Sequence, residues 1–192
     1  MLGNSETTIT YYSPYVQSGS SVSAWTMLTR ASCTAGIVQA GWLTIPLYGY
    51  ARGFYEWENC ANYGQGPRFD ARVGPVTTHF KVQHSTSNPG VVTAYAGSIL
   101  MLGNTQVDWV PNEVQVFSET HNVNDQNYGA VNAQQQFSNF TQCDGSGCYS
   151  NADFCLTAGN QAPGCVGPTS DWLHLTITGS PRWTTYDRDC LA

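Results

Sequence analysis

Short runs of strand-forming residues, each closed by a turn signal, constrain the fold of this chain most strongly. The runs are rich in Val, Thr, Trp and Tyr, and many alternate between two faces. Pro, Gly and Asn fill the gaps, as in Asn88-Pro89-Gly90 and Pro111-Asn112. We predict strands at residues 23–29, 37–45, 53–58, 79–84, 91–96, 98–102, 113–120 and 172–178. This pattern predicts an all-β fold, a β-sandwich or a barrel.

The length of 192 residues suits one domain that spans residues 1–192. Residues 1–20 are polar and rich in Tyr, and we expect an irregular or edge-strand lead-in there. Residues 126–170 are rich in Asn, Gln, Gly and Cys and show almost no alternation. We therefore predict a long, cysteine-rich loop region that disulfides hold in place.

Charge excludes several classes of partner. Only 10% of the residues are charged, Lys81 is the sole lysine, and the formal net charge is −6. Nucleic acid and anionic membrane surfaces are therefore not expected to bind. No apolar run approaches the roughly 20 residues of a membrane span, so no membrane insertion is expected. The few basic groups also limit self-repulsion on acidification, which makes work at low pH feasible.

Seven cysteines indicate an oxidising compartment, and we predict a secreted, extracellular protein. They are Cys33, Cys60, Cys143, Cys148, Cys155, Cys165 and Cys190. We expect Cys33 to pair with Cys60 and two local bridges among the four central cysteines. The odd count leaves one cysteine unpaired or available for an intermolecular disulfide. Residues 1–20 lack the pattern of a signal peptide, so a leader removed earlier is expected.

The segment Asn139-Phe140-Thr141 is an N-glycosylation sequon, which matters only where the source secretes through a glycosylating pathway. The four central cysteines lack the paired spacing of a zinc site, and residues 119–125 lack the spacing of an EF-hand loop. We therefore predict no metal and no cofactor.

Gln39 and Glu119 are the candidate catalytic residues. Alternation places Gln39 with Ile37 on one face of its strand, and Glu119 with Gln115 on one face of another. If the two strands are neighbours, the amide and the carboxylate can meet. A carboxylate can take a proton from water, and an amide can donate a hydrogen bond to a developing oxyanion. The structural alternative is a solvent-facing glutamate and a buried amide satisfied by backbone.

The segment Ile37-Val38-Gln39-Ala40-Gly41, then Tyr55-Glu56-Trp57, then a strand that carries Glu119, resembles the eqolisin glutamic peptidases. Ala40-Gly41-Trp42 and Pro46-Leu47-Tyr48-Gly49 are also similar to the neprosin-type peptidase domain, which uses two glutamates. The resemblance implies an antiparallel β-sandwich of two sheets, a concanavalin A-like or lectin-like jelly roll with disulfide-pinned loops. It also implies a Gln39/Glu119 dyad that hydrolyses polypeptide substrates in acid. It also implies a supporting place in the cleft, as substrate-binding residues, for Trp42, Tyr55, Glu56 and Trp57.

Other functions remain open from sequence. Trp42, Tyr55 and Trp57 can instead fill the core, the commoner place for aromatic residues. On a non-catalytic sandwich the same aromatics would stack on sugars, as in a carbohydrate-binding or surface-adhesion domain. A structural coat protein would use the odd cysteine for contacts between chains. Glu56 and Glu58 share a strand face, as two glycosidase carboxylates would, although an ordinary amphipathic strand accounts for them.

Overall fold

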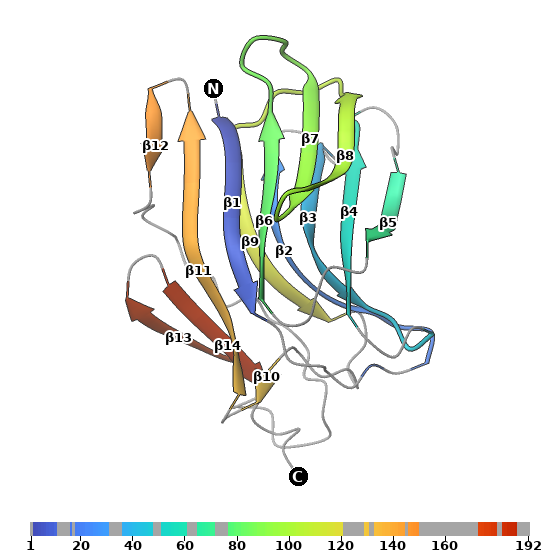
Figure 1. The fold of residues 1–192 in the computed structure, drawn as a ribbon, viewed down its shortest axis with the longest axis vertical. Helices are drawn as coiled ribbons and strands as arrows, with labels where there is room; N and C mark the ends of the chain where they lie inside the picture. Colours follow the sequence, from blue (N-terminus) through green and yellow to red (C-terminus); the bar gives the residue numbers. More distant parts are fainter. Residues whose placement is uncertain are drawn as a thin grey trace.

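The chain forms two antiparallel β-sheets stacked as a sandwich, as seen in a computed structural model (Figure 1). The structure describes residues 2–10, 16, 18–30, 36–47, 51–60, 65–71, 77–120, 129–130, 133–144, 146–149, 173–179 and 182–187. No helix occurs in these residues. The predicted antiparallel β-sandwich is therefore confirmed.

One sheet has nine strands, in the order β13-β14-β11-β1-β6-β7-β8, with β10 and β12 paired to β11. Its strands are β1 (Leu2–Thr10), β6 (Thr77–His84), β7 (Val91–Ala96), β8 (Ile99–Gln106), β10 (Gly129–Ala130), β11 (Ala133–Asp144), β12 (Gly147–Tyr149), β13 (Leu173–Gly179) and β14 (Arg182–Asp187). The other sheet has five strands, in the order β5-β4-β3-β2-β9. These are β2 (Val22–Thr29), β3 (Ile37–Thr44), β4 (Arg52–Glu58), β5 (Gln65–Ala71) and β9 (Glu113–Thr120).

The main core lies between the two sheets. Trp42 from the five-stranded sheet is fully buried and meets the ring of Phe80 edge-on, with centroids 5.3 Å apart. Its indole N–H donates to the backbone oxygen of Ile9, so the polar edge of the ring is satisfied inside the core. A buried hydroxyl pair, Ser5 and Thr26 at 2.6 Å, also joins β1 to β2. The interior thus combines aromatic packing with paired polar groups.

The expectation of an irregular lead-in was wrong for residues 2–10. These residues form β1, an interior strand between β11 and β6. Polar composition concealed the strand, because Ser5 and Thr7 are fully buried where apolar residues are the usual signal. Thr7 donates to the backbone oxygen of Ser138. Hydrogen bonding, rather than apolar character, makes these polar side chains compatible with burial.

The expectation of a long loop at residues 126–170 was wrong for its first part. Residues 133–144 form β11, the longest strand of the described residues. Its Gln, Ser and Asn residues hid a strand whose core contacts come from Phe137 and Phe140, both buried. Residues 150–170 lie outside the described part of the chain.

One predicted local bridge is confirmed, because Cys143 and Cys148 form a disulfide between β11 and β12. Cys60 is also disulfide-bonded. Its expected partner Cys33 lies outside the described residues, so that pairing stays a prediction. Cys155, Cys165 and Cys190 lie outside them as well.

Candidate functional site

The face of the five-stranded sheet that points away from the main core carries side chains aligned in rows across the strands. One row contains Gln115 of β9, Met27 of β2, Gln39 of β3 and Glu56 of β4. Residues paired directly in an antiparallel register share a face and lie side by side. The register therefore makes Glu56 the nearest carboxylate neighbour of Gln39 on this row.

Gln39 and Glu56 are joined by a short hydrogen bond. Nε2 of Gln39 donates to Oε2 of Glu56 at 2.5 Å. The Gln39 side chain is nearly buried, with 8% of its surface exposed, and Glu56 is half-buried. A hydrogen bond to a carboxylate is stronger than a neutral one, and shielding from water strengthens it further. The bond fixes the direction of the Gln39 amide and leaves its second N–H for another acceptor.

A second pair of amide and carboxylate lies across the sheet. Nε2 of Gln115 donates to Oε1 of Glu113 at 2.6 Å, both on β9. Met27 lies between Gln115 and Gln39 in the same row. Sequence reasoning missed this pair, although alternation along residues 113–120 already puts Glu113, Gln115 and Glu119 on one strand face.

Glu119 lies further along β9, at the register position opposite Ser23. Strands β3 and β9 are not neighbours, because β2 runs between them. Gln115, rather than Glu119, occupies the row of Gln39. Two strand spacings and four residues of rise put the Cα atoms of Gln39 and Glu119 roughly 16 Å apart on a flat sheet. The side chain of Glu119 is not among those described, so a water shared by the two residues stays a prediction.

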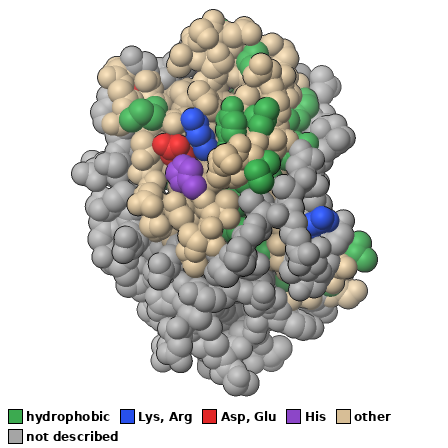
Figure 2. All heavy atoms as spheres, in the orientation of Figure 1, with side chains coloured by type: hydrophobic (Ala, Val, Ile, Leu, Met, Phe, Trp, Pro, Cys, Tyr) green, Lys and Arg blue, Asp and Glu red, His purple; other side chains and the backbone are tan. Residues whose placement is uncertain are grey.

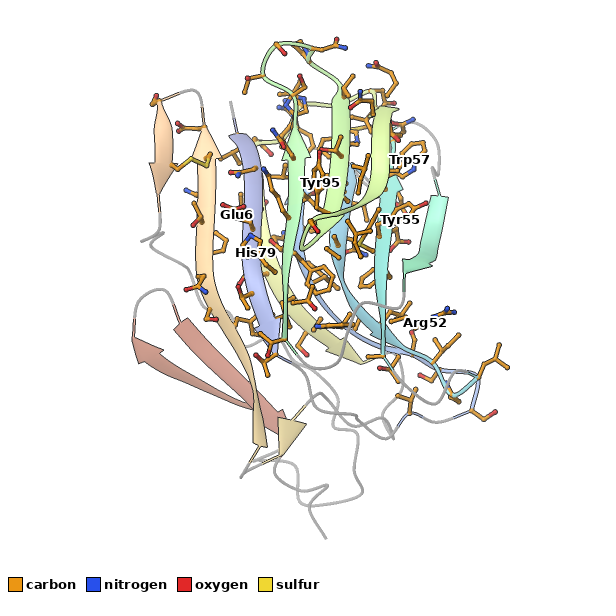
Figure 3. The ribbon with its side chains drawn as sticks, viewed as in Figure 1. Glu6, Arg52, Tyr55, Trp57, His79 and Tyr95 are labelled. Carbon is orange, nitrogen blue, oxygen red and sulfur yellow. A yellow bond between two sulfur atoms is a disulfide. The ribbon has the colours of Figure 1, made fainter. Side chains whose placement is uncertain are left out.

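Trp42 and Tyr55 lie on the core side of the five-stranded sheet. Trp42 is fully buried and Tyr55 is 6% exposed. Trp57 shares this side, is half-buried and packs against the main core; Figure 3 labels Tyr55 and Trp57 on β4. Among the four residues expected to bind substrate, Glu56 alone lies on the face of Gln39. The aromatic platform of a sugar-binding domain is not formed by Trp42 and Tyr55, because neither ring is accessible.

The sheet face that carries Gln39 and Glu56 also holds an apolar cluster. A second buried cluster there consists of Trp25, Met27, Leu43 and Phe54. Met27 is the register partner of Gln39. Sequence reasoning did not single out these residues, because they look like ordinary strand residues. Gln39 itself is buried, and the scarcity of water around its amide strengthens the electrostatic interactions that the amide makes.

Two titratable groups outside this face have shifted pKa values. The hydrogen bond from His79 is the main cause that lowers the pKa of Glu6, and Nε2 of His79 lies 3.3 Å from the Glu6 carboxylate. Figure 3 shows the two side chains together on β1 and β6, and Figure 2 shows acidic, basic and histidine side chains gathered on that face. Burial lowers the pKa of His84, whose Nε2 accepts the backbone N–H of Gly90 at 3.1 Å.

No group of three or more His, Cys, Asp or Glu side chains suited to a metal ion occurs within the described residues. The expected absence of a metal or cofactor stays a prediction. No helix there is long and apolar enough to cross a membrane.

Known proteins of similar structure support the interpretation of the fold. No protein-family model matches the sequence, and no curated protein matches it either. Among solved structures, scytalidoglutamic peptidase with a peptide-based transition-state analogue matches with a TM-score of 0.57 at 12% identity, over 97% of this chain and 92% of that one. The chain has the fold of the glutamic peptidases.

A second match is SCP-B, described as a member of the eqolisin family, in complex with the tripeptide Ala-Ile-His. Its TM-score is 0.54 at 12% identity, with the same coverage of both chains. At such identities the likeness establishes the fold alone. The neprosin part of the sequence resemblance gains no support from these matches and stays a prediction.

Proposed function

We propose that this chain is a secreted endopeptidase of the glutamic type that cleaves polypeptides in acid through Gln39 and Glu119. The observation that carries the proposal is the Gln39 amide, held by Glu56 on an outer sheet face of a glutamic-peptidase fold. Of the two similar structures, one contains a peptide-based transition-state analogue and the other a tripeptide. A peptide is therefore the proposed substrate here.

In the proposed reaction Glu119 acts as general base toward a water molecule. The water attacks the scissile carbonyl, and Glu119 then gives the proton to the leaving amine. The second N–H of Gln39 donates to the oxyanion of the tetrahedral intermediate. Because β2 runs between the two strands, the scissile bond would lie across β2, between Gln39 on β3 and Glu119 on β9. A carboxylate that works without a histidine suits acidic pH.

Glu56 has a positioning role in this scheme. A free glutamine side chain would lose rotamer freedom each time it bound the oxyanion, at a cost of up to about 2 kcal/mol. The bond to Glu56 fixes the amide in advance. Preorganised donors of this kind contribute most where water is excluded, and the Gln39 side chain is nearly buried.

Cleavage of a denatured protein between pH 2 and pH 8 tests the proposal. We expect acid-limited cleavage by the wild-type chain and a loss of about 100-fold or more in Gln39→Ala and in Glu119→Gln. Glu58→Gln is the matched control, because Glu58 shares a strand face with Glu56 but lies opposite Ile37. A folded wild-type chain that cleaves nothing at any pH would refute the peptidase proposal. Full activity in Glu119→Gln would refute the assignment of that residue alone.

A further inference from the structure

The sequence Asn139-Phe140-Thr141 is the sole Asn-x-Ser/Thr segment of the chain, and it lies within β11. We propose that Asn139 is an N-glycosylation site whose side-chain nitrogen carries an oligosaccharide. This inference is independent of the proposed peptidase activity. It rests on the local geometry of β11, on the exposure of Asn139, and on the disulfides of the chain.

Asn139 lies in a β-bulge. Along β1 the register advances two residues, from Glu6 to Thr8, while along β11 it advances three, from Ser138 to Thr141. The extra residue is accommodated by Asn139, whose φ is +54°, in the left-handed region. Asparagine is among the few side chains that tolerate this conformation.

The bulge turns Asn139 outward while its neighbours stay inside. Phe137 and Phe140 are three residues apart, which in a regular strand would put them on opposite faces. Both are nonetheless buried, at 1% and 0% exposure, and Asn139 is exposed. The bulge thus changes the alternation so that both rings reach the core and the sequon asparagine faces solvent.

The amide of Asn139 makes one long hydrogen bond among the described residues. Its Nδ2 donates to the hydroxyl of Thr8 at 3.4 Å, and that hydroxyl also lies 3.2 Å from Nδ1 of His79. Thr8 and His79 belong to β1 and β6 of the nine-stranded sheet, on its solvent side. A glycan on Asn139 would therefore extend into solvent from the nine-stranded sheet. Gln39 lies on the other sheet, so the glycan would not obstruct it.

The disulfides supply a second, independent observation. Cys143, on the same strand as Asn139, is disulfide-bonded to Cys148 of β12, and Cys60 is also bonded. Such bonds form in the oxidising compartments through which secreted proteins pass, and N-glycosylation of sequons belongs to secreted proteins.

The group transfer requires a lipid-pyrophosphate-linked oligosaccharide as donor. Nδ2 of Asn139 forms a bond to the anomeric carbon of the first sugar, and the bond between that carbon and the pyrophosphate oxygen breaks. The lipid pyrophosphate leaves with the bonding electron pair, and the amide loses one proton. One N–H remains on Nδ2, so the asparagine stays a donor after modification.

The test is secretion of the full chain from a eukaryotic host that N-glycosylates proteins, followed by intact-mass measurement before and after peptide N-glycosidase. We expect wild type and Thr141→Ser to lose the mass of one glycan on digestion, with Asp found in place of Asn139 by peptide mapping. Asn139→Gly keeps the left-handed conformation and Thr141→Val keeps the shape of the side chain. Both should be secreted without the added mass.

Secreted wild-type protein with unmodified Asn139 would overturn the proposal. Modification of Asn139 in Thr141→Val would overturn the dependence on the sequon. Asn139 could instead be present only because it tolerates the left-handed backbone conformation. A glycan on the wild type that is absent from a folded, secreted Asn139→Gly variant would show that Asn139 is a modification site. Folding of each variant is checked by its thermal unfolding temperature.

Discussion

Among the glycines whose surroundings the structure describes, Gly41 is the one where an added methyl group would meet the nearest atom. A Cβ added there would lie 2.0 Å from the backbone oxygen of Ala24 and 2.6 Å from Cα of Trp25, its register partner. Ordinary contact begins near 3.4 Å, so β3 and β2 must separate by about 1.4 Å (3.4 − 2.0) at this point. The obstacle is backbone, which cannot rotate away as the end of a side chain can.

The cost follows from what such a displacement breaks. Two flanking ladder hydrogen bonds contribute about 1 kcal/mol each, and overpacking of a dense interior adds about 1–3 kcal/mol. We expect Gly41→Ala to lower the free energy of unfolding by roughly 3–5 kcal/mol. In a chain of this size that lowers Tm by about 6–20 °C. Calorimetry or circular dichroism at neutral pH measures the shift.

Gly103→Ala is the matched control. Gly103 also lies in a strand, but a Cβ added there has no atom within 4 Å, and its φ lies outside the left-handed region. Alanine restricts the conformations of the unfolded chain more than glycine does. The free energy of unfolding of this variant should therefore stay unchanged or rise by about 0.4–1 kcal/mol. A Gly41→Ala variant that unfolds at the same temperature as Gly103→Ala would refute the close approach of β3 to β2.

Three further outcomes are expected. Glu56→Ala should lower kcat about 10-fold with KM little changed. Glu56→Gln should recover part of the lost kcat, because its side chain again offers an acceptor to Gln39. Equal kinetics in the wild type and both variants would contradict the positioning role of Glu56. Because burial lowers the pKa of His84, the unfolded chain takes up its proton first, and urea unfolding should show stability falling as pH drops below its ordinary value of 6.5. The stability of His84→Gln should fall less over the same pH range. Parallel pH profiles of wild type and variant would exclude His84 as the cause. Replacing Cys143 and Cys148, five residues apart, by Ser should cost about 2 kcal/mol by calorimetry, and an unchanged Tm would refute this.

The parts of the fold that alternation predicted are the strands with apolar faces. Residues 91–96 and 113–120 were predicted with the bounds that β7 and β9 have in the structure. Strands β1 and β11 were not predicted, because β1 buries Asn4, Ser5 and Thr7 and β11 consists largely of polar residues. An alternating apolar pattern reveals a buried strand face only where the buried side chains are apolar. Side chains that are buried because they form hydrogen bonds, such as Ser5 and Thr26, leave no such pattern in the sequence.

The candidate site shows a different limit. Alternation assigns Gln39 and Glu56 to strand faces, and the hairpin between β3 and β4 is local, so their contact could have been predicted from neighbouring runs. Glu119 belongs to a strand that reaches the sheet from far along the chain, and no local signal says which strand it joins.

The order of strands therefore decides what the candidate residues can do. Strand β2, which precedes Gln39 in the chain, lies between β3 and β9, so a substrate must span the distance between the Gln39 amide and any carboxylate on β9. Direct contact between amide and carboxylate occurs instead at Glu56. Met27, the register partner of Gln39 on β2, is buried in an apolar cluster. In such low-dielectric surroundings a fixed amide N–H stabilises a negative charge that develops beside it more strongly than it would in bulk water.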